Sequence, residues 1–145
     1  MLATYIAGPF RASTGWGIEQ NVRKAELVGL MVAKLGILPV IPHTMFRWYH
    51  GENEDQFWLN AMLELMFRTD AVLFLDDWKT SAGSLAEEIA AQQRNMPCFY
   101  LSQRGLTELA RWRDQASNKP LEPVATPRQI ADFGTEWKKR NVRND

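Results

Sequence analysis

The stretch SAGSLAEE at residues 81–88 sets an acidic side chain among small residues, directly after an apolar run. A carboxylate can act as a nucleophile, and the small side chains of Ala82, Gly83 and Ala86 would let a substrate ring approach Glu87 closely. Ser84 followed three residues later by Glu87 also matches a capping box, in which the glutamate only closes the start of a helix. The sequence leaves both interpretations open.

Both interpretations place Glu87 in the first turn of a helix that starts near Ser81 or Ser84. Unpaired N–H groups and the helix dipole favour the charged form of a carboxyl group at that end. We therefore expect Glu87 to be ionised, and suited to nucleophilic attack rather than proton donation. Glu88 points about 100° away around the helix, and we expect it to be solvated or at the rim of a site.

A second candidate segment is GPFRASTG at residues 8–15, which follows a short apolar strand. Its backbone N–H groups, the hydroxyls of Ser13 and Thr14 and the Arg11 guanidinium could hold a phosphate group. An ordinary polar turn explains the same residues. Tyr5 lies in the preceding strand, where its phenol would come near this loop if it faces the correct side, although most strand tyrosines are core residues.

Two further groups of residues could contribute to a site. His43 and His50 flank aromatic residues that could stack on a planar base, namely Phe46, Trp48 and Tyr49. Two histidines seven residues apart in a loop do not form a metal signature, and surface or packing roles are the alternative. Asp76 and Asp77 follow an apolar run, and either could face a cleft.

Composition favours a single domain over residues 1–145 that binds a small molecule. The chain has 46% hydrophobic residues, enough for one sizeable core. Seventeen basic residues balance 17 acidic ones and are scattered, which argues against nucleic acid polymers and anionic membranes as partners. Cys98 is the single cysteine, which excludes an internal disulfide and fits a reducing cytoplasm. We find neither a membrane span nor a signal peptide, and expect a cytoplasmic protein.

Strand-like and helix-like segments alternate along the chain. Strand signals lie at residues 2–7, 37–42, 71–76 and 97–102. Helical periods lie at residues 18–35, 57–69, 81–94 and 105–113. Residues 43–56 show no period and are expected to form a loop. Thr126 and Pro127 are typical of a helix start, and we expect a last helix there before a polar tail from about residue 136.

This alternation predicts an α/β fold: a single-domain three-layer sandwich with a flavodoxin-like or Rossmann-like parallel sheet of four to five strands and helices on both faces. In such sheets ligands bind beyond the carboxyl ends of the strands, where the strand order reverses. Residues 8–15 and 76–84 would both lie at that edge.

Three segments together resemble the nucleoside 2-deoxyribosyltransferase-like superfamily: TYIAGPF at residues 4–10, DAVLFLDDW at 70–78 and SAGSLAEEIAA at 81–91. The superfamily includes deoxyribosyltransferases, 2′-deoxynucleoside 5′-phosphate N-hydrolases and uncharacterised phage-borne and bacterial groups. The resemblance covers about residues 3–101. Its most specific part is the spacing of Trp78, Ser81, Gly83 and Glu87.

The resemblance implies a flavodoxin-like sheet, a homo-oligomer (a dimer or higher) whose neighbouring subunit helps close each site, and neither a cofactor nor a metal. It also implies that Glu87 is the nucleophile and Tyr5 the active-site tyrosine. Phosphate-binding members carry an arginine in the first loop and a serine six residues before the nucleophile. Arg11 and Ser81 occupy those places, which favours the 5′-phosphate branch.

One position departs from the family pattern. An aspartate expected in the second helix, about eight residues before Asp70, is replaced by Met62. The nearest polar neighbours are Asn60 and Glu64, and neither can be assumed to take over its role. Because that aspartate is thought to assist the departing base, the proton source here is open, with Asp77 or a water as candidates.

The expected activity is cleavage of the N-glycosidic bond of a (deoxy)nucleoside 5′-monophosphate through a covalent glycosyl intermediate on Glu87. Base exchange by a nucleoside deoxyribosyltransferase and a non-catalytic nucleotide-binding module are the alternatives. The predicted catalytic residues are Glu87, Tyr5 and Asp77. The predicted binding residues are Gly8, Pro9, Phe10, Arg11, Ser13, Asn60, Trp78, Ser81 and Gly83.

Overall fold

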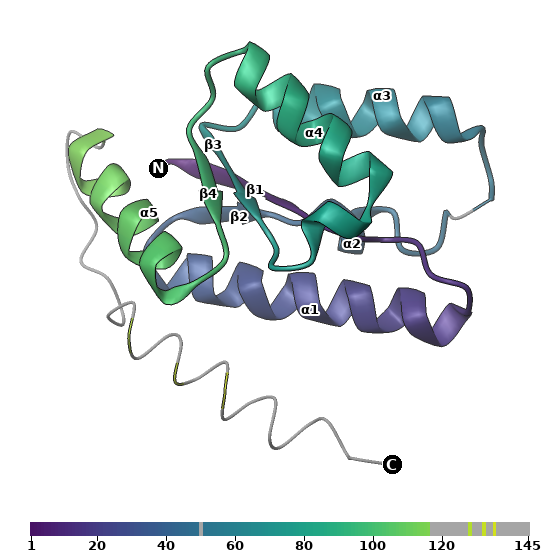
Figure 1. The fold of residues 1–145 in the computed structure, drawn as a ribbon, viewed down its shortest axis with the longest axis horizontal. Helices are drawn as coiled ribbons and strands as arrows, with labels where there is room; N and C mark the ends of the chain where they lie inside the picture. The colour runs from purple at the N-terminus through teal and green to yellow at the C-terminus, as the bar shows by residue number, and fades with distance from the viewer. Residues whose placement is uncertain (50, 117–127, 129–131, 133–134, 136–145) are drawn as a thin grey trace.

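Four parallel strands form one sheet at the centre of the protein (Figure 1). The computed structural model describes residues 1–49, 51–116, 128, 132 and 135. The strands are β1 (Ala3–Ala7), β2 (Leu38–Val40), β3 (Ala71–Phe74) and β4 (Cys98–Tyr100). Their spatial order is β2-β1-β3-β4. The central strands β1 and β3 are apolar and almost entirely buried, as expected for parallel strands covered on both faces.

Helices cover both faces of this sheet. They are α1 (Gly15–Lys34), α2 (Pro42–Met45), α3 (Asp55–Met66), α4 (Ala82–Gln93) and α5 (Gln103–Ala116), with a short 3₁₀ helix η1 (Trp78–Thr80). Figure 1 shows α1 and α5 on one side of the sheet, and α3 and α4 on the other. The predicted three-layer, Rossmann-like sandwich with a single domain is therefore confirmed, with four strands among the described residues.

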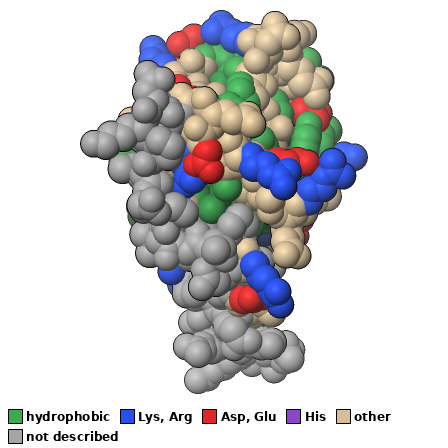
Figure 2. Space-filling view, turned by 90° about the vertical axis from the view of Figure 1, so that its left-hand side faces the viewer, with side chains coloured by type: hydrophobic (Ala, Val, Ile, Leu, Met, Phe, Trp, Pro, Cys, Tyr) green, Lys and Arg blue, Asp and Glu red, His purple; other side chains and the backbone are tan. Residues whose placement is uncertain are grey.

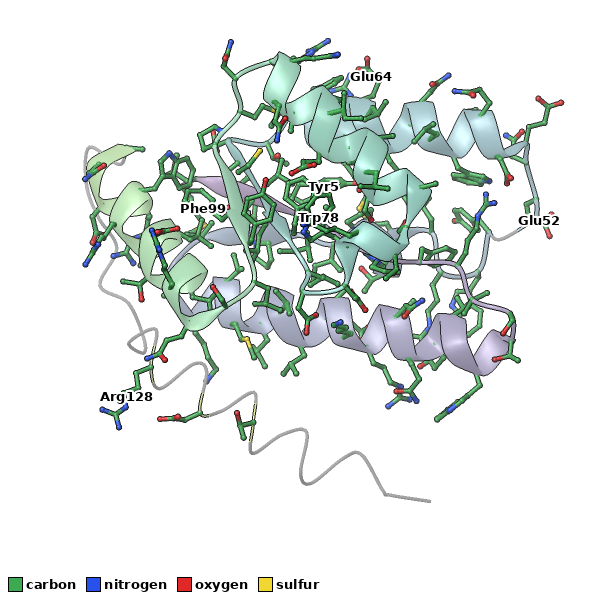
Figure 3. All side chains as sticks on the ribbon, viewed as in Figure 1. Tyr5, Glu52, Glu64, Trp78, Phe99 and Arg128 are labelled. Carbon is green, nitrogen blue, oxygen red and sulfur yellow. The ribbon has the colours of Figure 1, made fainter. Side chains whose placement is uncertain are left out.

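Successive side chains of the central strands pack in two separate hydrophobic cores, because a strand points its side chains to alternate faces of the sheet. Ile6 and Leu73 pack against α1 and α5. Tyr5 and Phe74 belong to the opposite core, with residues of α3 and α4. Figure 3 shows Tyr5 and Trp78 between the sheet and α4. The register of β1 thus turns the Tyr5 side chain toward the helix that carries Glu87.

The ends of α1 follow from local sequence signals. Thr14 is the N-cap, and its Oγ1 accepts a hydrogen bond from the backbone N–H of Gly17 at 3.0 Å. Gly36 follows the helix with φ of 75°, a left-handed conformation that glycine adopts without strain. The predicted start at residue 18 is three residues late, because the first turn is exposed and carries no apolar period.

The structure differs from the predicted elements in other places as well, among them α5, which spans Gln103–Ala116 and not residues 105–113. The predicted loop at residues 43–56 contains most of the one-turn helix α2, which is too short to produce a hydrophobic period. Helix α3 begins at Asp55 rather than residue 57 and ends at Met66 rather than residue 69. The predicted helix after Thr126 and the polar tail from about residue 136 lie outside the described residues, apart from residues 128, 132 and 135.

The surface mixes charges of both signs. Figure 2 shows basic and acidic side chains next to one another on one face, among apolar and uncharged surface. Within residues 1–49 and 51–116, no helix combines the length and the apolar character that crossing a membrane requires.

Candidate active site

A cavity of about 510 Å³ opens at the carboxyl edge of the sheet, within the usual size range of small-molecule sites. From β1 the chain passes to β2, which lies on one side of β1, and then to β3, which lies on the other side of β1. The strand order therefore reverses at this edge of the sheet, which makes it the topological switch point. The residues that line it from β1 and its loop are Tyr5, Gly8, Pro9, Phe10 and Arg11. Those from α4 and the turn before it are Thr80, Ser81, Ala82, Gly83, Ser84 and Glu87.

Glu87 and Tyr5, 82 residues apart in sequence, meet at the inner end of this cavity. The Tyr5 hydroxyl donates a hydrogen bond to Glu87 Oε1 at 2.5 Å. Tyr5 is fully buried, and Glu87 is 7% exposed while lining the cavity. Two of the three predicted catalytic residues, Glu87 and Tyr5, are therefore in direct contact.

The prediction that Glu87 is held in its charged form is wrong. Burial raises the pKa of Glu87 from 4.5 to about 7, against the lowering effect of the Tyr5 hydrogen bond. Burial, with the negative charge of Glu87 beside it, also raises the pKa of Tyr5 well above its ordinary value, so its phenol stays protonated and able to donate. At neutral pH the free protein therefore holds both the acid and the carboxylate form of Glu87.

The capping prediction is also wrong, for a geometric reason. The N-cap of α4 is Ser81, whose Oγ accepts from the backbone N–H of Ser84 at 3.3 Å. Glu87 therefore lies in the second turn of the helix, beyond the unpaired N–H groups of the first. Ser84 lies inside the helix, is 1% exposed and lines the cavity, and its hydroxyl has no hydrogen-bond partner among the described residues.

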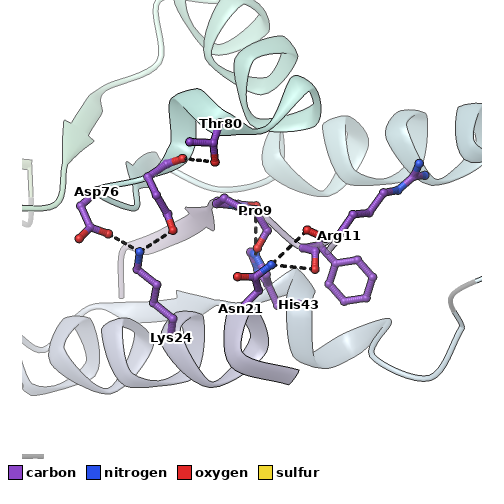
Figure 4. A network of polar contacts seen from close by, with 10 residues as sticks. Pro9, Arg11, Asn21, Lys24, His43, Asp76 and Thr80 are labelled. Atoms are coloured by element: carbon purple, nitrogen blue, oxygen red, sulfur yellow. Dashed lines mark hydrogen bonds and ion pairs between the residues drawn. The ribbon is translucent and has the colours of Figure 1, made fainter. Parts of the chain in front are cut away.

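The loop after β1 lies against the end of β3 and is held by α1. A Cβ atom on Gly8 would lie 2.7 Å from Leu75 Cγ, so any larger residue there would force the Leu75 side chain to shift. The side-chain amide of Asn21 donates to the carbonyl oxygens of Phe10 and Arg11 at 3.1 and 3.2 Å (Figure 4). These contacts fix the backbone at the entrance of the cavity.

Arg11 lines the cavity as predicted, but its guanidinium is paired with an aspartate that the sequence analysis did not consider. Arg11 Nη1 donates to Asp55 Oδ2 at 2.8 Å, and Nη2 contacts Oδ1 of the same carboxylate. The hydrogen bond to Asp55 raises the pKa of Arg11 above its ordinary value. This pair joins the β1–α1 loop to the first turn of α3.

Four of the predicted site residues are not among the described residues that line the cavity. Ser13 is exposed in the loop. The Asp77 carboxylate pairs with Lys24 Nζ at 2.7 Å (Figure 4). Trp78 packs in the core against Phe74, with ring centroids 5.3 Å apart. Asn60 is exposed on α3. The proposed roles of Asp77 in proton donation and of the other three in binding have no support from this placement.

The His43 side chain contacts the backbone of the loop that follows β1. Its Nε2 lies 3.1 Å from the carbonyl oxygen of Gly8 and 3.2 Å from that of Pro9, so this nitrogen carries the proton in the neutral ring. Burial lowers the pKa of His43, although the two carbonyl groups and Asp77 act in the opposite direction. The residues that the structure describes hold no group of three or more histidine, cysteine, aspartate or glutamate side chains arranged to bind a metal.

Aromatic rings form one wall of the cavity. Phe46 and Tyr49, both predicted, line it together with Trp58, which the sequence analysis missed. The ring centroids of Phe46 and Trp58 are 5.2 Å apart, and those of Tyr49 and Trp58 are 6.0 Å apart. Trp48 is exposed and does not belong to this wall, and His50 lies outside the described residues.

One face of α3 supplies the part of the site that sequence inspection overlooked. Asp55, Trp58, Leu59 and Met62 all line the cavity, at the spacing of one helical face. The apolar residues of this face belong to the predicted helical period, but a period does not distinguish a helix face that packs in the core from one that lines a cavity. Met62 places a thioether where the resembling family carries an aspartate.

These observations define an α/β protein of the three-layer Rossmann-like class with a buried, partly protonated carboxyl group in a ligand-sized cavity at the switch point. The chain belongs to the family described as a domain of unknown function, DUF7768, whose model matches residues 3–101. The matched range contains all the described cavity-lining residues. Comparison with curated proteins and with solved structures gave no match.

Proposed function

We propose that this protein cleaves the N-glycosidic bond of a (deoxy)nucleoside 5′-monophosphate, with Glu87 as the nucleophile. The observation that carries the proposal is the buried Glu87 carboxyl group, held by the Tyr5 hydroxyl at 2.5 Å inside a cavity large enough for a nucleotide. The resemblance of three segments to the nucleoside 2-deoxyribosyltransferase-like superfamily supports the same chemistry.

The electrostatics of Glu87 suit a reaction in which positive charge develops beside it. Its pKa is raised by burial, and no cationic side chain in the described part of the chain lowers it. Breaking a C1′–N bond generates an oxocarbenium-like sugar, whose positive charge would lie next to the carboxylate in a poorly hydrated site. Because the carboxylate has no cationic partner among the described residues, it interacts more strongly with the transition state than with a neutral substrate.

The proposed reaction has two steps. In the first, a Glu87 oxygen forms an ester bond to C1′ while the C1′–N bond breaks, and the base leaves with the electron pair and takes up a proton. In the second, a water molecule attacks C1′, releases the Glu87 carboxylate and loses a proton. Met62 and the Lys24-paired Asp77 are both unsuitable as acids, so we propose that water supplies the proton to the base.

The remaining cavity walls fit the other parts of such a substrate. The rings of Phe46, Tyr49 and Trp58 offer a stacking surface for a nucleobase. Arg11 and the Ser81 hydroxyl lie in the two loops of the cavity edge and are proposed to hold the 5′-phosphate. Binding energy from the phosphate would then position C1′ against Glu87.

The test is incubation of the protein with a panel of ribo- and deoxyribonucleoside 5′-monophosphates and chromatographic detection of free base. We expect base release from at least one monophosphate, and a loss of about 10³-fold or more in Glu87→Gln, because an amide cannot form the ester intermediate. Thermal unfolding of the variant controls for folding. Release at an undiminished rate by folded Glu87→Gln would refute the role of Glu87.

One observation favours a second candidate, a transferase that exchanges bases on free nucleosides. The Arg11 guanidinium is already neutralised by Asp55, so a substrate without a phosphate would not have to compete for it. The transferase would form a new nucleoside when a nucleoside and a second free base are supplied together. The N-hydrolase would yield sugar phosphate and base under the same conditions.

The proposal includes a homo-oligomer and a cytoplasmic location. Exposed apolar side chains, Trp48, Tyr49 and Phe57, lie in and beside the aromatic wall of the cavity, and a neighbouring subunit that covered them would help close the site. Light scattering on the purified protein measures its mass in solution. A monomeric mass would contradict this part of the proposal.

A further inference from the structure

The Arg11–Asp55 ion pair lies at the cavity and joins two separate elements. Arg11 comes from the β1–α1 loop and Asp55 from the first turn of α3, and both side chains line the cavity. The pair is bidentate, with Nη1 2.8 Å from Oδ2 and Nη2 in contact with Oδ1. The side chains are 58% and 74% exposed, so the pair is accessible to a ligand from solvent.

We propose that Asp55 is a specificity-determining residue that occupies the anion-binding fork of Arg11 until a phosphate monoester displaces it. This inference rests on the proposed function, because it concerns the 5′-phosphate of the same substrate. Asp55 then weakens phosphate binding in proportion to the strength of its own pair with Arg11, and it leaves the binding of neutral nucleosides unchanged.

The chemistry of the two anions supports this competition. A guanidinium binds carboxylate and phosphate through the same planar fork of N–H groups, so one Arg11 cannot hold both in bidentate form. A phosphate monoester carries more negative charge than a carboxylate and has three terminal oxygens to share with the Ser81 side of the cavity. An exposed carboxylate–arginine pair is weak and screened, so a phosphate can replace it.

The structure also gives Asp55 a stable position after displacement. Asp55 is the first residue of α3, where the helix dipole favours a negative charge whether or not Arg11 is present. The backbone around Arg11 is held by the Asn21 amide at 3.1 and 3.2 Å from two carbonyl oxygens. Figure 4 shows the Arg11 side chain extending away from that anchored backbone. The exchange therefore requires only side-chain rotation.

The experiment compares ligand affinities by calorimetric titration, using Glu87→Gln as the background so that no substrate is consumed. The probes are deoxyadenosine and thymidine 5′-monophosphates, each beside its own nucleoside. We expect Asp55→Asn to tighten monophosphate binding about two- to fivefold, the range set by an exposed ion pair, with nucleoside binding unchanged. Glu54→Gln is the matched control, because Glu54 is the adjacent acidic residue and makes no side-chain cap.

A double substitution separates competition from a general charge effect. If Asp55 acts through Arg11, Asp55→Asn brings no gain when Arg11 is already replaced by Gln. A gain that persists with Arg11→Gln, or an equal gain from Glu54→Gln, would overturn the proposal. Unchanged or weaker monophosphate binding by Asp55→Asn would overturn it as well.

The same measurements distinguish failure of this inference from failure of the proposed function. If Asp55→Asn tightens monophosphate binding through Arg11 but the wild-type protein releases no base, the competition stands and the N-hydrolase fails. If wild-type protein releases base but Asp55→Asn binds monophosphate no better, the N-hydrolase stands and the competition fails. If no monophosphate binds to any variant, both are wrong.

Discussion

Glu87 is the residue at which two general electrostatic effects oppose each other. Proximity to a helix N-terminus favours a carboxylate, whereas burial favours the neutral acid. Burial prevails because the N-cap is Ser81, which leaves Glu87 in the second turn. There the Tyr5 hydroxyl is the one described group that stabilises its charge. The pKa of about 7 makes the protonation state of Glu87 sensitive to pH in the neutral range.

The rate of base release should follow the ionisation of Glu87. A nucleophile must be deprotonated, so kcat/KM is expected to rise with pH and to level off above the pKa of about 7. Between pH 6 and pH 8 the fraction of carboxylate in the free protein grows about tenfold. A pH–rate profile measures this limb, and a rate that falls over the same interval would show that Glu87 acts as a proton donor instead.

Stability should depend on pH through the same group. The pKa of Glu87 is about 7 in the folded protein, above its ordinary value of 4.5. The contribution of the protonated Glu87 to the free energy of unfolding is therefore complete below pH 4.5 and is lost as the pH rises through 7. The loss is about 3 kcal/mol at most, and Glu87→Gln avoids it. Urea unfolding at pH 5 and pH 8 should show that the variant gains stability relative to wild type at the higher pH; a pH-independent difference would contradict the assignment.

Removing the Tyr5 hydroxyl should move the active pH range. The Tyr5 hydrogen bond lowers the pKa of Glu87, so Tyr5→Phe is expected to raise that pKa and to shift the rising limb of the profile to higher pH. At pH 7 the rate should fall about tenfold, the size of one hydrogen bond to a charged group, and recover at higher pH. A uniform loss at all pH values would instead indicate a structural role for the hydroxyl.

At the scale of elements, two glycines at the cavity edge carry different constraints. Gly8 ends the β1 connection against β3, and a Cβ there would lie 2.7 Å from Leu75 Cγ and 3.1 Å from Leu75 Cβ. Gly83 is in the first turn of α4, where the nearest atom to an added Cβ is Ser81 Oγ at 3.7 Å. Packing therefore disfavours a side chain at position 8 but leaves room for one at position 83.

Alanine at each position should separate folding from substrate access. Gly8→Ala is expected to lose about 1–3 kcal/mol of unfolding free energy through overpacking. Gly83→Ala should fold at least as stably as wild type, since alanine is the better helix former, yet should lose activity because its methyl group faces the incoming substrate. Unfolding curves and base release measure the two effects. Full activity in Gly83→Ala would show that no close approach occurs there.

The elements that could be predicted are those with a strong local signal. The apolar runs of β1 and β3 and the period of α1 were sufficient to predict the parallel sandwich. The loops that follow these strands indicated the sheet edge at which the structure has its cavity. The one-turn helix α2 was not predicted, because it is too short to show a hydrophobic period. Helix α3 was predicted from its period, but a period does not show which apolar residues face a cavity instead of the core, so Trp58 was missed. Asp55 was missed because the helix begins two residues before the predicted start.

At the scale of the whole molecule, the site depends on strand order, which local patterns do not encode. The order β2-β1-β3-β4 places the loop after β1 beside the turn after β3, and so brings Tyr5 to Glu87 across 82 residues. Asp77 follows the same strand yet turns toward Lys24 of α1, on the other face of the sheet. Asp77 and Glu87 were therefore predicted to share one site because both follow β3. In the structure Asp77 pairs with Lys24, whereas Glu87 lines the cavity.

The central claim is that the Glu87 carboxylate attacks an anomeric carbon inside the cavity. The most direct measurement is mass spectrometry of the protein after reaction with a 2′-fluorinated nucleoside 5′-monophosphate, whose electron-withdrawing fluorine slows hydrolysis of the ester. The account predicts a mass gain equal to the fluorinated sugar phosphate on the peptide that contains Glu87, and none in Glu87→Gln. Release of free base without any adduct on that peptide would contradict it.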